Sequence, residues 1–138
     1  MPIALTPGEE REVVLPCDSK LPEDQRTYFK VRSLTQRERT SIRDRAVSMD
    51  QDTGEVTTKN GTQALLAVQC GLVGWRNFRD ASGNEVECVL EEKARTIAGV
   101  KRRPPTDASL DRLRTSDLQA LAKLIMEDNS LDADDTKD

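Results

Sequence analysis

The run 71–86 constrains the fold of this chain more than any other stretch. It contains the only tryptophan, one of the two phenylalanines and three of the seven glycines. Apolar residues next to glycines predict a helix that ends abruptly, with Trp75 folded back beneath it. Residues 80–84 are dense in turn formers, and 85–89 then alternate like a short strand. We therefore predict a helix–turn–strand joint in which Trp75 and Phe78 anchor a small core.

The composition predicts a lean core beneath a highly charged surface. Hydrophobic residues make up 36% of the 138 residues and aromatic residues only 3%, so the core must be mostly aliphatic. Charged residues reach 33%, which is above the usual share in globular domains. We expect one domain with tails. Its stability is marginal unless a partner supplies further burial.

Charge and hydropathy argue against several classes of partner. The net charge of −4 disfavours general nucleic-acid binding, which needs an excess of Lys and Arg. We expect no membrane span, because no apolar run approaches about 18 residues, and no secretory signal at the N-terminus. The three cysteines, Cys17, Cys70 and Cys88, are odd in number and widely spaced. This pattern predicts reduced thiols in a cytoplasm.

Two strand pairs are predicted in the first half of the chain. Residues 12–15 and 27–32 predict a β-hairpin whose connecting loop is polar and contains prolines. Turn signals on both sides of 55–58 predict a short strand or flap.

A helix is predicted between these two features. Thr35 and Glu38 form a capping-box pattern, which begins a helix that we expect to run to about Met49. Ile42, Ala46 and Met49 would form a narrow apolar stripe. The remaining face would be solvent-exposed and carries Arg37, Arg39, Arg43 and Arg45.

An apolar helix from about Thr62 to Gly71 should lie at the centre of the fold. The fold class we expect is α+β, with a small antiparallel sheet from the 12–32 and 85–90 segments packed on two or three helices. Two further helical patterns follow, at 109–114 and in a helix capped by Thr115 or Ser116. From Glu127 onward the sequence has six carboxylate side chains and one lysine, which predicts a disordered acidic tail.

The Pro104-Pro105 pair cannot continue a helix and is typical of a boundary. We divide the chain into four parts. These are an α+β core domain (1–100), a basic and proline-containing linker (101–108), a C-terminal helical segment (109–127) and the acidic tail (128–138).

Residue types that carry catalysis or bind metals are scarce. The chain has no histidine, which removes the commonest general base and the commonest metal ligand. The cysteines lack CxxC spacing, and no glycine motif for phosphate binding occurs. We therefore predict that the protein is not an enzyme and has no catalytic residues, no metal site and no cofactor.

Two surface features each allow two interpretations. The basic cluster Lys101–Arg103 is either a solvated linker or a contact for nucleic acid or an acidic partner. The apolar stripe of the last helix either packs on the protein's own core or docks in a partner's groove. That stripe consists of Leu118, Leu121, Ala122 and Ile125.

The joint also carries a resemblance to a known group of proteins. Residues 71–78 read Gly-Leu-Val-Gly-Trp-Arg-Asn-Phe, and an Asp-x-x-Gly-Asn turn follows at 80–84. This pattern resembles one found in small bacteriophage structural-operon proteins, many of them tail assembly chaperones. The strand and capped helix that begin at Tyr28, and the closing helix over 113–126, are similar to other parts of such proteins.

The resemblance implies a tail assembly chaperone-like factor in phage tail morphogenesis. Such a factor binds a long, largely helical tape-measure protein in the host cytoplasm, without catalysis. The expected partners are the tape-measure protein or other tail proteins, and a homo-oligomer is left open. We expect binding to neither nucleic acid nor a membrane. An alternative is a virion component such as a head–tail joining or minor capsid protein. A small regulatory or nucleic-acid-binding protein is a third hypothesis.

Specific residues follow from these interpretations. The core anchors we expect are Leu65, Leu72, Val73, Trp75 and Phe78. The partner-binding candidates are Leu118, Leu121 and Ile125.

Overall fold

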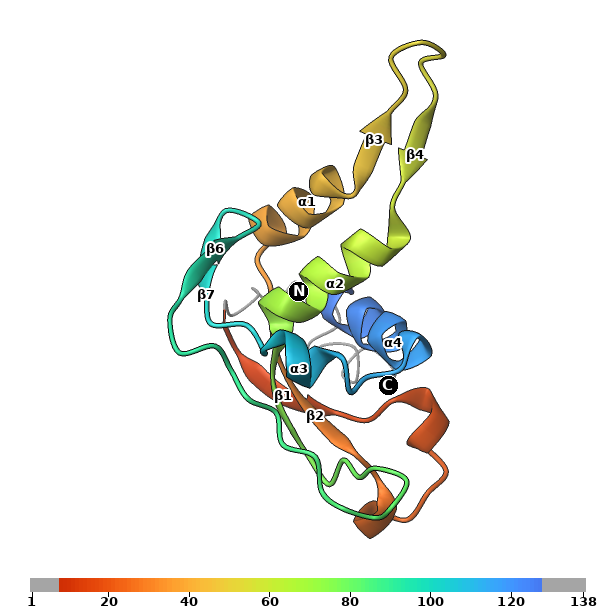
Figure 1. Ribbon diagram of the computed structural model, residues 1–138, viewed down its shortest axis with the longest axis vertical. Coiled ribbons are helices and arrows are strands. Elements are labelled where there is room, and N and C mark those ends of the chain that lie inside the picture. Colours follow the sequence, from red (N-terminus) through yellow and green to blue (C-terminus); the bar gives the residue numbers. More distant parts are fainter. Residues whose placement is uncertain (1–7, 128–138) are drawn as a thin grey trace, which may run out of the picture.

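The computed structural model describes residues 8–127 and has an α+β fold (Figure 1). The predicted acidic tail, 128–138, lies outside the described residues. Three short strands form an antiparallel sheet in the order β1-β2-β5. They are β1 (Glu10–Val13), β2 (Tyr28–Arg32) and β5 (Leu72–Arg76). The β1–β2 hairpin predicted from the sequence is confirmed, with Glu12 opposite Lys30.

Four helices and two further hairpins complete the described part of the chain. The helices are α1 (Gln36–Arg45), α2 (Asn60–Gly71), α3 (Asp107–Leu110) and α4 (Thr115–Met126). One hairpin joins β3 (Val47–Met49) to β4 (Val56–Thr58), and the other joins β6 (Arg95–Ile97) to β7 (Val100–Arg102). Short 3₁₀ turns, η1 (Pro16–Asp18) and η2 (Glu23–Gln25), lie in the loop between β1 and β2.

The third strand of the sheet is not the one predicted. Residues 85–90 form only isolated bridges, at Glu85 and at Leu90. Instead α2 continues directly into β5, because Leu72 already has extended backbone angles (φ −82°, ψ 125°) at the helix end. Trp75 therefore lies on a strand opposite Phe29. The joint is helix–strand–turn, and its turn, at 80–84, is closed by a hydrogen bond from the Gly83 N–H to the Asp80 carbonyl.

Helix α1 begins as predicted and ends earlier. Thr35 and Glu38 form a complete capping box. The helix stops at Arg45 because Val47 and the next two residues pair with β4, which leaves Met49 64% exposed. The prediction that the arginine face is solvent-exposed is also wrong at Arg39, which is buried, as is its neighbour Glu38. Glu38 accepts a hydrogen bond of 2.7 Å from Arg102, so its burial is compensated by an opposite charge.

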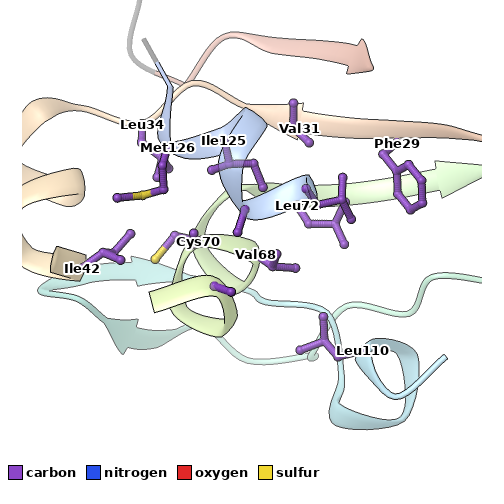
Figure 2. Close-up of a cluster of buried hydrophobic side chains, with 14 of the residues drawn as sticks. Phe29, Val31, Leu34, Ile42, Val68, Cys70, Leu72, Leu110, Ile125 and Met126 are labelled. Carbon is purple, nitrogen blue, oxygen red and sulfur yellow. The ribbon is translucent and has the colours of Figure 1, made fainter. Parts of the chain in front are cut away.

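The core forms where α4 packs along α2 and against the sheet (Figure 2). Side chains from β2, α1, α2 and α4 converge there, with Ile42 and Cys70 near one end of the cluster and Phe29 near the other. The prediction that residues 101–108 form a linker is wrong. Pro104 and Pro105 are among the most completely buried side chains, since the chain folds back along Leu90 after β7.

Gly71 packs directly against Ile125 of α4. A Cβ atom at this position would lie 2.5 Å from Cγ2 of Ile125. We expect Gly71→Ala to lower the free energy of unfolding by about 1–3 kcal/mol through overpacking. In an exposed helix the same change would stabilise by about 1 kcal/mol. Urea denaturation of Gly71→Ala measures the effect.

Gly61→Ala is the matched control, because it lies on the same helix with open space around its Cβ position. It should be neutral or stabilising. In an Ile125→Ala background the cost of Gly71→Ala should shrink, because the clashing methyl group is gone. An equal cost in both backgrounds would refute the close-contact explanation.

Three aromatic rings close the end of the core farthest from α1. Trp75 packs edge-on against Phe29 and Phe78, with ring centroids 6.1 and 5.1 Å away. Its indole N–H donates to the Val86 carbonyl at 2.8 Å. Trp75 therefore holds the 77–86 loop against the sheet as well as filling space.

Trp75→Ala should lower the free energy of unfolding by about 3 kcal/mol, because it removes the ring packing and leaves the Val86 carbonyl without its donor. Trp75→Phe keeps a ring and should cost less. Thermal melts followed by circular dichroism compare the two. A Trp75→Ala protein with the wild-type melting temperature would show that this ring is not an anchor.

Candidate protein-interaction site

The described residues hold no constellation suited to metal binding. Within residues 8–127 there is no group of three or more cysteine, histidine or acidic side chains placed to hold a metal ion. None of the helices in this range is both long and apolar enough to span a bilayer.

The three thiols lie in different environments and are unpaired. Burial raises the pKa of Cys70 to about 11, and its Sγ lies 3.9 Å from the Ile97 carbonyl oxygen. Burial also raises the pKa of the half-buried Cys88 to about 11. The pKa of the exposed Cys17 is raised by partial burial and by neighbouring Asp18. A raised pKa lowers the thiolate fraction, so these residues lack the activation of a catalytic nucleophile.

The structure places the expected core anchors unequally. Leu72 is buried, and Trp75 is half-buried and packs against the core cluster. Val73 and Phe78 are half-buried, and the Phe78 ring lies 5.9 Å from that of Phe29. Leu65 is not an anchor, because it is 40% exposed on the outer face of α2. An almost wholly apolar helix sequence gave no signal to distinguish its inner face from its outer face.

The partner-binding candidates on α4 lie mostly inside the molecule. Leu121 and Ile125 are buried and Leu118 packs half-buried against the same cluster. Of the two interpretations of this stripe, the structure supports packing on the protein's own core. In this conformation Leu121 and Ile125 are not available to a partner, because α2 covers them.

The basic cluster at 101–103 does not form a single patch. Arg102 pairs with Glu38, and Arg103 donates through Nε to the Glu91 carbonyl. Lys101 is exposed. The three cations are therefore divided between internal contacts and solvent, which gives no contiguous basic surface on this hairpin.

A groove lies between α1, α2 and α4 and is here called the helical groove. Its volume is about 590 Å³. Its apolar floor is made by Ala64, Ala122 and Met126, all of them largely buried. Each helix contributes residues spaced three or four apart, which places them on one face. The polar and charged lining consists of Gln36, Arg39, Arg43, Asn60, Gln63, Gln119, Lys123 and Glu127.

The rim of the helical groove is positively charged. Its lining includes the exposed cations Arg43 and Lys123 and the buried Arg39, against a single carboxylate, that of Glu127. Neither Arg43 nor Lys123 forms an ion pair with another described residue, and both are exposed. An apolar floor with a cationic rim suits an amphipathic segment that carries acidic side chains. The sequence did not predict this groove, because its residues come from three separated helices.

The second exposed feature is the β3–β4 hairpin with its flanking residues, 46–59, here called the hairpin arm. It projects beyond α1 and α2, away from the three-stranded sheet (Figure 1). Val47, Met49 and Val56 are 46%, 64% and 61% exposed. The turn signals in the sequence predicted a short strand or flap here, and the pairing of β4 with β3 confirms it.

Searches of known protein families, of curated proteins and of solved structures find no match to this chain. The assignment of function therefore depends on the residues themselves.

Alkylation of the native protein should distinguish the three thiols. With a pKa near 11, roughly 0.1% of Cys70 and Cys88 is thiolate at pH 8. Iodoacetamide should therefore modify the exposed Cys17 first, as read by mass spectrometry of the peptides. In urea all three should react at similar rates. Native Cys70 reacting as fast as Cys17 would contradict its burial.

Proposed function

We propose that this protein is a phage tail morphogenesis factor of the tail assembly chaperone type, acting by protein–protein binding in the host cytoplasm. The proposal rests on the resemblance of 71–84 to small phage structural-operon proteins, and the tape-measure protein is the partner which that resemblance implies. The described residues offer contact surfaces, which are compatible with a binding role.

The observation that carries the proposal is the helical groove. A tape-measure protein is long and largely helical, and an amphipathic helix binds a groove by placing its apolar face on an apolar floor. Ala64 and Ala122 are small enough for a helix to approach closely. Arg43 and Lys123 at the rim favour a helix that carries Asp or Glu beside its apolar face.

The contact surface on α4 therefore differs from the one expected from the sequence. Leu121 and Ile125 hold α4 against α2, whereas the adjacent stripe of Gln119, Lys123 and Met126 lines the groove. One helix thus serves the core with one face and is free to contact a partner with the neighbouring face.

The hairpin arm favours a second candidate, a virion component such as a head–tail joining or minor capsid protein. A projecting two-stranded arm offers backbone edges and apolar side chains to neighbouring subunits, as in β-augmentation. The two candidate functions predict different final locations for the protein. A chaperone is absent from purified particles, whereas a structural subunit persists in them.

The test of the groove is co-expression of the full chain with the product of the downstream long reading frame, followed by pull-down. We expect a soluble complex. The double variant Gln119→Glu/Lys123→Glu should lose at least tenfold in affinity, because it places negative charge at the rim facing an acidic helix. Both side chains are exposed, so the fold should be retained.

Lys20→Glu/Gln25→Glu is the matched control. It makes the same two chemical changes at exposed positions outside the groove, and binding should be unchanged. Equal loss in both variants would attribute the effect to net charge and not to the groove. No complex, with the chain recovered in purified particles, would favour the structural-subunit candidate.

A further inference from the structure

The segment that follows α4 is attached at the edge of the helical groove. Lys123, Met126 and Glu127 all line the groove, and Glu127 caps α4 with extended backbone angles (φ −74°, ψ 141°). The last turn of α4 is therefore part of the groove wall, and the chain leaves the helix there. Segment 128–138 itself lies outside the described residues, but its point of attachment is a lining residue of the groove.

The charge of segment 128–138 complements that of the groove. The segment contains five aspartates and one lysine, so it accounts for the whole net charge of −4 of the chain. The rim cations Arg43 and Lys123 are exposed and form no ion pair with another described residue. An acidic segment attached within a Debye length of these cations is attracted to them with little screening.

Leu131 gives the segment an apolar side chain at a suitable distance. It lies four residues beyond Glu127, and four extended residues span at most about 14 Å. The groove residues of α1, from Gln36 to Arg43, cover about 10 Å of helix. Leu131 is therefore within reach of the apolar floor without any change in the fold.

The order of residues also places the charges on the appropriate side. Side chains of an extended segment alternate, so Leu131 and Ala133 would face the floor while Asp132 and Asp134 would face the open side of the groove. The exposed rim cations lie on that open side. Because the segment is tethered, its effective concentration at the groove is on the order of millimolar, so even a weak contact is populated.

We propose that segment 128–138 occupies the helical groove of its own chain, with Leu131 on the apolar floor and aspartates beside Arg43 and Lys123. A partner helix that binds the groove must then displace the segment, which acts as a built-in competitor. The competition rests on the proposed function, whereas the occupancy of the groove does not.

Carbodiimide cross-linking of the full chain tests the occupancy without any partner. Arg43→Lys keeps the charge at the rim and supplies an amine on α1 that can form an amide with a nearby aspartate. Mass spectrometry of the monomeric product should find this amine joined to Asp132, Asp134 or Asp135. Arg37→Lys is the matched control, because Arg37 is exposed on the same helix and does not line the groove. Its cross-link to the segment should be several-fold weaker.

Leu131→Asn tests the apolar contact, because it leaves the charge of the segment unchanged. It should lower the Arg43→Lys cross-link several-fold. It should also raise the affinity for the product of the downstream long reading frame roughly tenfold, since the competitor has lost a buried leucine. Thr136→Asn is the matched control in the same segment, and it should change neither the cross-link nor the affinity.

The outcomes separate this inference from the proposed function. Equal cross-linking of Arg43→Lys and Arg37→Lys, or cross-links found only between two copies of the chain, would overturn the intramolecular occupant. A cross-linked groove in a chain that forms no complex would support the occupant and count against the proposed function. A complex whose affinity is the same for wild type and Leu131→Asn would overturn the competition.

Discussion

The contact between α2 and α4 is the interaction on which the rest of the fold depends. Gly71 lets Ile125 reach the backbone of α2, and this approach positions α4 so that Leu121 is completely buried. Because aromatic residues are so few, the core gains its density from close helix packing and not from large rings. The position of α4 in turn sets the width of the helical groove, since α4 forms one of its walls.

A second constraint ties the N-terminal end of α1 to the β6–β7 hairpin. Glu38 closes the capping box with one carboxylate oxygen and accepts from Arg102 with the other. Arg32 lies in the same electrostatic environment, where burial and the nearby charge of Arg102 lower its pKa. A single buried carboxylate thus fixes the helix start and balances cations from two other elements. This explains why the 101–103 segment is part of the folded body and does not act as a separate basic patch.

The two candidate interaction surfaces have different physical origins. The helical groove is a by-product of core packing, because three helices that share one apolar centre leave a channel where their polar edges meet. The hairpin arm contributes almost nothing to that core, and its apolar face has no intramolecular use among the described residues.

The sequence by itself determined the local features: the capping box at Thr35–Glu38, the first hairpin, the 80–84 turn and the α+β class. Each depends on residue patterns within short stretches of the chain, which propensity and periodicity can detect. Tertiary structure decided which apolar strand joined the sheet, which face of α2 was buried and where Pro104 and Pro105 lay. It also decided that Leu121 and Ile125 serve the core, while their neighbours on α4 line a groove. These outcomes depend on contacts between residues far apart in the chain, and no local pattern records them.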